Sequence, residues 1–168
     1  MCGIFAICHP KGCPSSAHFD VQKAQQMSIR QKHRGPDYRG VYQHPKNGNI
    51  LCHERLAIMD LGCIQPIQGT REDHQVIHNG EIYNFRSLEK GELSEYKFTT
   101  TCDSEGSYWN KANVLGVDKD GRHFFSSEMK CIEDTCGESF LQAFPPGHYW
   151  TPEEAWFNTT SPAGTTMN

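Results

Sequence analysis

The opening run of the chain, Met1-Cys2-Gly3-Ile4-Phe5-Ala6, constrains the fold more than any other segment. A short apolar run that is β-branched and aromatic, and that ends at Pro10 and Gly12, is typical of a buried strand. The sequence therefore predicts that residues 3–8 form a core strand. The second residue of the chain then lies at the beginning of that strand.

Cys2 would become the first residue of the chain if Met1 were removed. Its thiol would then lie beside a free α-amino group, which titrates at about 7.7 to 8.0 and can take a proton from a thiol near neutral pH. One residue would thus supply both a nucleophile and its base. The alternative interpretation is a small buried residue at the start of a strand. Position alone leaves both interpretations open.

Length and charge restrict the class of protein. A chain of 168 residues with a net charge of −4 fits a single domain. No apolar run approaches the roughly 18 residues that cross a bilayer, and the N-terminal run lacks the basic flank of a secretory signal. We therefore expect a cytoplasmic protein without a membrane partner. Basic residues form no stripe with interleaved aromatics, which argues against nucleic acid and favours a small polar ligand.

Eight cysteines occur in the chain. An even number in a short chain can indicate a disulfide framework, but without an export signal we expect reduced, mostly buried thiols. There is no Cys-x-x-Cys pair of the kind that binds structural zinc. Cys8-His9 with Cys13, and Cys52-His53, come nearest to such spacing. We expect no metal site, and a small Cys/His metal protein stays as an alternative.

Residues 20–32 have helical spacing, with Asp20 as the predicted N-cap. Lys and Arg gather in the predicted last turn, where the helix dipole favours them. His33-Arg34-Gly35-Pro36-Asp37 then predicts a loop, because Pro disfavours helix in the residue before it. The apolar residues expected on one side of the helix are Val21, Ala24, Met27 and Ile29.

The rest of the chain alternates short strands and turns. Strands are predicted in residues 41–44, 49–59, 76–78, 96–101 and 122–127, and a short helix after Ile82. Many strands with a few helices and no repeat favour an α+β fold. We predict one domain over residues 1–157, and a disordered tail over 158–168, which is rich in Thr, Ser, Pro and Gly.

Two segments carry candidate chemistry. Asn79-Gly80 could direct backbone and side-chain N–H groups at an oxyanion, and Glu81 could bind a cation; the alternative is a hairpin turn with a solvated Glu. Arg55 lies in an apolar run, on one strand face with His53 and Ala57, and could bind a carboxylate bidentately. The alternative is an edge-strand Arg paired with Glu54 or Asp60.

Several motifs together resemble the N-terminal glutaminase domain of glutamine-dependent asparagine synthetases, over residues 1–105 and again from about 114 to 150. The motifs are Met1-Cys2-Gly3-Ile4-Phe5, His33-Arg34-Gly35-Pro36-Asp37, His53-Glu54-Arg55-Leu56-Ala57-Ile58, Gln65-Pro66, Asn79-Gly80-Glu81-Ile82-Tyr83-Asn84, Ser127-Glu128-Met129-Lys130 and Phe144-Pro145-Pro146-Gly147-His148.

The resemblance implies a class II glutamine amidotransferase domain with the N-terminal-nucleophile hydrolase fold, an αββα sandwich of two antiparallel sheets between helical layers. It implies that Cys2 attacks the side-chain amide of L-glutamine through a thioester, and that the Arg34 loop lies over the pocket. The remaining roles are an oxyanion hole of Asn79 and Gly80, an α-carboxylate site of Arg55, Leu56, Ala57, Ile58 and Met59, and an α-ammonium site of Glu81 and Asp103.

The chain departs from the family in three places. Residues 106–113 replace a long helix, a pair of central strands and a turn, so we expect an incomplete sandwich. Cys102-Asp103-Ser104 stands where the family more commonly has Ser-Asp-Cys. No Ser-Gly-Gly-x-Asp-Ser motif for ATP is present, so we expect no cofactor here, and ATP and Mg²⁺ only in a synthetase domain or protein that would be a partner. The alternative function is an inactive remnant that acts as a binding or regulatory module.

Overall fold

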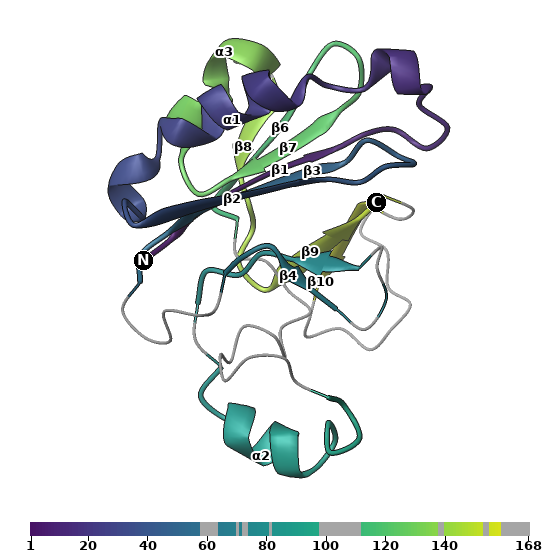
Figure 1. Cartoon of the computed structure of the whole chain (residues 1–168). Coiled ribbons are helices and arrows are strands. Elements are labelled where there is room, and N and C mark those ends of the chain that lie inside the picture. The colour runs from purple at the N-terminus through teal and green to yellow at the C-terminus, as the bar shows by residue number, and fades with distance from the viewer. Residues whose placement is uncertain are drawn as a thin grey trace.

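The computed structural model describes residues 1–57, 64–69, 71, 74–80, 82–97, 112–137 and 140–152, and the backbone of 155–158. Its main element is a six-stranded antiparallel sheet with the strand order β2-β3-β1-β7-β6-β8 (Figure 1). The strands are β1 (Gly3–Cys8), β2 (Tyr38–Gln43), β3 (Ile50–Arg55), β6 (Val114–Val117), β7 (His123–Ser126) and β8 (Leu141–Ala143).

Two short ladders and three helices complete the described chain. The ladders are β4 (Ile67–Gln68) with β5 (Gln75–Val76), and β9 (His148–Thr151) with β10 (Ala155–Asn158). The helices are α1 (Val21–Ile29), α2 (Phe85–Lys90) and α3 (Glu133–Cys136), and 3₁₀ turns occur at Ser15–Ala17, Lys32–Arg34 and Met129–Cys131. No helix in the described ranges is long and apolar enough to cross a membrane.

Strand β1 lies inside the sheet, which confirms the predicted core strand. It pairs with β3 on one side, with Gly3 opposite Glu54, and with β7 on the other, with Phe5 opposite Ser126. The chain therefore begins in the most internal part of the sheet.

Helix α1 covers one face of the sheet together with α3 (Figure 1). The predicted cap is confirmed, because the Asp20 carboxylate accepts a hydrogen bond of 2.7 Å from the backbone N–H of Lys23. The helix ends at Ile29 rather than 32, so the basic residues fall in the following 3₁₀ turn. The prediction that Ile29 shares one side of the helix with Ala24 and Met27 is wrong, because its side chain is 39% exposed and Ser28 takes the buried position. A period of 3.6 residues places Ser28 with Ala24 on the inner side.

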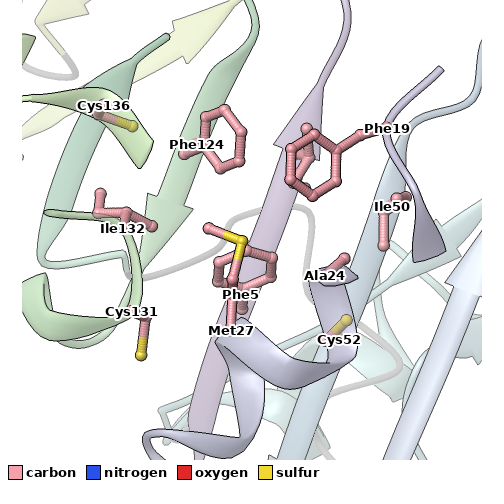
Figure 2. Close-up of a cluster of buried hydrophobic side chains, with 11 residues drawn as sticks. Phe5, Phe19, Ala24, Met27, Ile50, Cys52, Phe124, Cys131, Ile132 and Cys136 are labelled. Atoms are coloured by element: carbon pink, nitrogen blue, oxygen red, sulfur yellow. The ribbon is translucent and has the colours of Figure 1, made fainter. Parts of the chain in front are cut away.

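The core lies between this helix-covered face and the helices. Figure 2 shows Phe5, Phe19, Met27 and Phe124 gathered there. The Phe124 ring makes edge-on contacts with the rings of Phe5 and Phe19, with centroids 6.4 and 5.4 Å apart. Such pairs add to the stabilisation that apolar burial already gives.

The opposite face of the sheet carries Ile4, Ala6, Leu51 and Phe125. Trp150 of β9 packs on Phe125 with ring centroids 4.9 Å apart. A cavity of about 480 Å³ remains between this face and β9. Among the described strands, only those of the ladders β4–β5 and β9–β10 lie on this side, where the resemblance predicts a second sheet (Figure 1).

The α+β prediction is confirmed, and the six-stranded sheet with its helices forms one half of the predicted sandwich. Strand β3 lies between β2 and β1, so the alternative of an edge-strand Arg55 is wrong. The strand predicted over 49–59 is Ile50–Arg55, and residues 58–60 lie outside the described part of the chain. Asn158 is the last residue of β10, and residues 159–168 also lie outside it.

Candidate active site

Cys2 immediately precedes β1 and lies across from the end of β3. The backbone N–H of Leu56 points at the Cys2 Sγ atom over 3.4 Å, and Sγ is 3.8 Å from the carbonyl oxygen of Leu56. The thiol is half-buried. The sequence places it there because the β1–β3 register sets Gly3 opposite Glu54. The sulfur therefore has a hydrogen-bond donor beside it and stays open to a small molecule.

The Gly35–Asp37 loop is fixed against the same end of β3. The Asp37 N–H donates to the carbonyl oxygen of Arg55 over 3.0 Å, and the Asp37 carboxylate accepts from the N–H of Ala57 over 2.7 Å. A Cβ atom at Gly35 would overlap the backbone of Glu54. Only glycine allows this close approach.

Arg34 joins this loop to the start of the chain. Its Nε atom donates to the carbonyl oxygen of Cys2 over 3.1 Å, and its Nη1 atom lies 3.4 Å from the Glu128 carboxylate. That the Arg34 loop lies over the pocket stays a prediction, and the Arg34 side chain contacts the backbone of Cys2.

His53 and Arg55 point to the opposite face of the sheet, because side chains alternate along β3 and Leu51 lies on that face. His53 is fully buried and Arg55 is 7% exposed. Burial lowers the pKa of His53 to about 4, and the charges of Arg55 and His78 act in the same direction. The imidazole of His53 is therefore neutral at pH 7, and Arg55 supplies the positive charge on this face.

Asn79 and Gly80 follow His78, whose backbone N–H donates to the side-chain oxygen of Gln65 over 2.6 Å. The ring of His78 lies against Gly80, where an added Cβ atom would be 2.9 Å from Nε2. Asn79 is half-buried and Gly80 is exposed. His78 acts on the pKa of His53 in two ways, because its backbone hydrogen bond raises this pKa and its charge lowers it, so the two residues lie close together.

The structure thus brings Cys2, Arg55, Leu56 and Ala57 together, and the two histidines connect this group to the Asn79-Gly80 bend. Ile58, Met59, Glu81 and Asp103 lie outside the described residues. Among the residues that the structure does describe, no group of three or more His, Cys, Asp or Glu could hold a metal ion.

Sequence reasoning assigned no role to Gln31, His78 or Glu128. The Gln31 amide donates to the carbonyl oxygen of Ile4 over 2.9 Å, and its side chain fills the space that a Cβ atom at Gly3 would need. Glu128 lies in one of the motifs that carried the resemblance. That motif was the only signal for it, because its contacts with His33 and Arg34 span 95 and 94 positions of sequence.

The model of the glutamine amidotransferase domain family matches residues 1–107. This match covers more than half of the chain and contains Cys2, the Arg34 loop, β3 and the Asn79-Gly80 bend.

The chain belongs to the glutamine amidotransferase family.

Its curated relatives are asparagine synthetases. A probable glutamine-hydrolysing asparagine synthetase of Dictyostelium discoideum is 34% identical, with 94% of this chain and 34% of the relative covered. The nodule enzyme of Pisum sativum is 32% identical over 94% of this chain and 33% of the relative. Asparagine synthetase 1 of Arabidopsis thaliana is 30% identical, with 97% of this chain and 35% of the relative covered. The amidotransferase chain thus spans about a third of the length of these relatives.

The alignments also bear on the predicted shortening. The match to the Dictyostelium protein runs over 197 residues but uses 94% of this chain, about 158 residues, so that about 39 positions lack a counterpart here. The family match ends at residue 107, within the segment 106–113 that was predicted to be shortened.

Proposed function

We propose that this domain hydrolyses L-glutamine to glutamate and ammonia, with Cys2 as the nucleophile. The observation that carries the proposal is the half-buried Cys2 sulfur, 3.4 Å from the N–H of Leu56 at the end of the strand that bears Arg55. Family membership supports glutamine as the substrate. Met1 is 78% exposed, so the peptide bond before Cys2 is open to removal of Met1.

Substrate binding follows from charge. The buried guanidinium of Arg55, with the backbone of Leu56, Ala57, Ile58 and Met59, would hold the α-carboxylate. Glu81 and Asp103 would hold the α-ammonium group. One cation and two anions match the zwitterionic end of glutamine, and the side-chain amide then extends toward the sulfur.

The chemistry needs no cofactor. The α-amino group of the processed Cys2 takes the thiol proton as Sγ attacks the amide carbon, and Asn79 and Gly80 donate hydrogen bonds to the oxyanion. The same amine returns the proton to the leaving nitrogen, which departs as ammonia and leaves a thioester. Water then attacks the thioester, which releases glutamate and restores the thiol.

The ammonia acceptor would be a synthetase domain or a separate synthetase protein, so that this chain serves asparagine biosynthesis as the glutaminase part. ATP and Mg²⁺ would act only there. Adenylation of aspartate by such a partner would need an ATP site, and the motifs of this chain supply none.

An inactive binding module is the second candidate. About 39 positions of the match to the Dictyostelium protein have no counterpart in this chain, which favours this second candidate. Lost strands would expose the opposite face of the sheet and loosen the substrate pocket. Such a module would still bind glutamine through Arg55 without turnover.

Glutamate release separates the two candidates. Mass spectrometry first establishes that the N-terminal residue is Cys2, and glutamate is then measured with the processed protein and with Cys2→Ala. We expect glutamate release from the processed wild-type protein and none from Cys2→Ala. Equal rates would reject the enzymatic proposal, and calorimetric binding of glutamine to both proteins without turnover would support the binding module.

A further inference from the structure

Cys2 is held by a side chain rather than by the sheet. The β1–β3 ladder begins with Gly3 opposite Glu54, and the carbonyl oxygen of Cys2 accepts its hydrogen bond from Arg34 Nε over 3.1 Å. The Cys2 sulfur contacts the backbone of Leu56 at 3.4 and 3.8 Å. Once Met1 is removed, the Arg34 contact is the hydrogen bond that holds the backbone carbonyl of the terminal residue.

The orientation of Arg34 depends in turn on Glu128. A guanidinium is planar, so a contact at Nε and a second at Nη1 together fix its plane. The second contact is the Glu128 carboxylate at 3.4 Å, and both side chains are largely buried, with 16% and 22% of their surfaces exposed.

Glu128 is itself fixed relative to Cys2. Its carboxylate also binds Lys130 at 2.9 Å and His33 at 2.8 Å. Burial tends to raise the pKa of Glu128, but the hydrogen bonds from Lys130 and His33 outweigh this effect and lower it, so the side chain is ionised at neutral pH.

The backbone beside Glu128 is bound to β1. Ser127 and Ile4 exchange two hydrogen bonds of 3.0 Å, one from the Ser127 N–H to the Ile4 carbonyl and one from the Ile4 N–H to the Ser127 hydroxyl. Ile4 lies two residues after Cys2 in the chain. These bonds therefore fix the backbone beside Glu128 relative to the nucleophile.

We infer that Glu128 is a positioning residue for the nucleophile: it orients the Arg34 guanidinium so that Nε holds the carbonyl of Cys2, and it does not touch the substrate. This inference rests on the glutamine hydrolysis proposed above. The Arg34–Glu128 ion pair is long, at 3.4 Å, and keeps some contact with solvent, so we expect it to contribute little to folding stability and the effect of Glu128 to fall on the reaction rate.

A double-mutant cycle tests the inference, with kcat and KM measured for the processed wild type, Glu128→Ala, Arg34→Ala and the double variant. We expect Glu128→Ala to lower kcat about tenfold with a KM within about twofold, since small misplacement of a reacting group is costly. In the Arg34→Ala background Glu128→Ala should have no further effect. The matched control is Asp134→Ala, which removes an exposed partner of Arg30 at 2.7 Å and should leave kcat unchanged.

A second readout is independent of turnover. 2-Cyanobenzothiazole condenses only with a terminal cysteine that has both a free amine and a free thiol, and a released terminus should react several-fold faster in Glu128→Ala and Arg34→Ala. The inference is overturned if Glu128→Ala lowers kcat equally in both backgrounds, or if kcat and labelling are both unchanged. If the wild type releases no glutamate, the proposed function fails, and the labelling rates alone then confirm or reject the positioning role.

Discussion

The guanidinium of Arg39 binds the buried carboxylate of Glu54 through two hydrogen bonds, of 2.7 and 3.2 Å. The two residues are register partners in the β2–β3 ladder. Glu54 is 1% exposed and also accepts a hydrogen bond of 2.9 Å from the Ser28 hydroxyl on α1. The bond to Glu54 is the main cause that raises the pKa of Arg39. The Arg39–Glu54 pair and the Ser28 hydroxyl therefore connect strands β2 and β3 to helix α1.

Arg39→Ala should lower the free energy of unfolding by about 3 to 5 kcal/mol, because it leaves a buried carboxylate without its cation. Urea unfolding followed by circular dichroism measures the change. Arg86→Ala is the matched control, since its partner Glu89 lies 3.2 Å away on the surface and the Arg86 side chain is 71% exposed. A similar loss in both variants would show that burial of Glu54 is not the cause.

Gly35→Ala should destabilise the protein by about 3 kcal/mol and lower glutamine hydrolysis, because the new methyl group would overlap the Glu54 backbone and push the Arg34 loop away from Cys2. Thermal unfolding and glutamate release check the two effects. Gly91→Ala is the comparison, because its nearest neighbour would be the Ser87 carbonyl oxygen at 3.1 Å. Normal stability of Gly35→Ala would contradict the close approach.

The buried His53 should make stability depend on pH. Its pKa is about 4 in the folded protein against 6.5 for an ordinary histidine, so between these values the unfolded chain binds a proton that the folded chain does not. The free energy of unfolding should therefore fall as the pH is lowered, by about 2 to 3 kcal/mol at pH 4.5 from this residue. Urea unfolding at pH 7 and pH 4.5 should show a smaller decrease for His53→Gln. An identical decrease in both proteins would contradict this assignment.

The described thiols should differ in reactivity. Burial raises the pKa of Cys8, Cys52 and Cys136 to about 12, so almost no thiolate forms there at pH 8. Iodoacetamide followed by peptide mass spectrometry should modify the half-buried Cys2 much faster than these three. Glutamine should slow modification of Cys2 and leave the half-buried Cys13, which lies in the turn after β1, unaffected. Equal protection of Cys2 and Cys13 would argue against glutamine binding at Cys2.

Local features of the fold could be predicted from the sequence. The strand Gly3–Cys8 and the Asp20 cap depend on neighbouring residues only, and both are confirmed. The end of α1 could not be located, because the basic residues after it suit a helix end and a 3₁₀ turn equally. Ile29 was misplaced because a period of 3.6 residues turns it away from the side that Ala24 and Ser28 share.

The contacts of the candidate site depend on register and on long-range packing. Strand alternation predicted that His53 and Arg55 share a face, but not that β3 would be internal or that Arg39 would take the Glu54 carboxylate. Arg34 reaches Cys2 across 32 positions of sequence, and Glu128 reaches Arg34 across 94. No local sequence pattern predicts contacts between residues so far apart in the chain. The resemblance identified the motifs that contain these residues, but not the contacts between them.

Strand β1 has a hydrogen-bonded neighbour on each side, and the proposed nucleophile is attached directly to its first residue. The backbone of the proposed nucleophile is consequently continuous with a strand that is hydrogen-bonded on both sides, and the Arg34 side chain holds its carbonyl group. In the proposed reaction, glutamine would then enter and ammonia would leave through movement of the surrounding side chains and bends rather than of this strand.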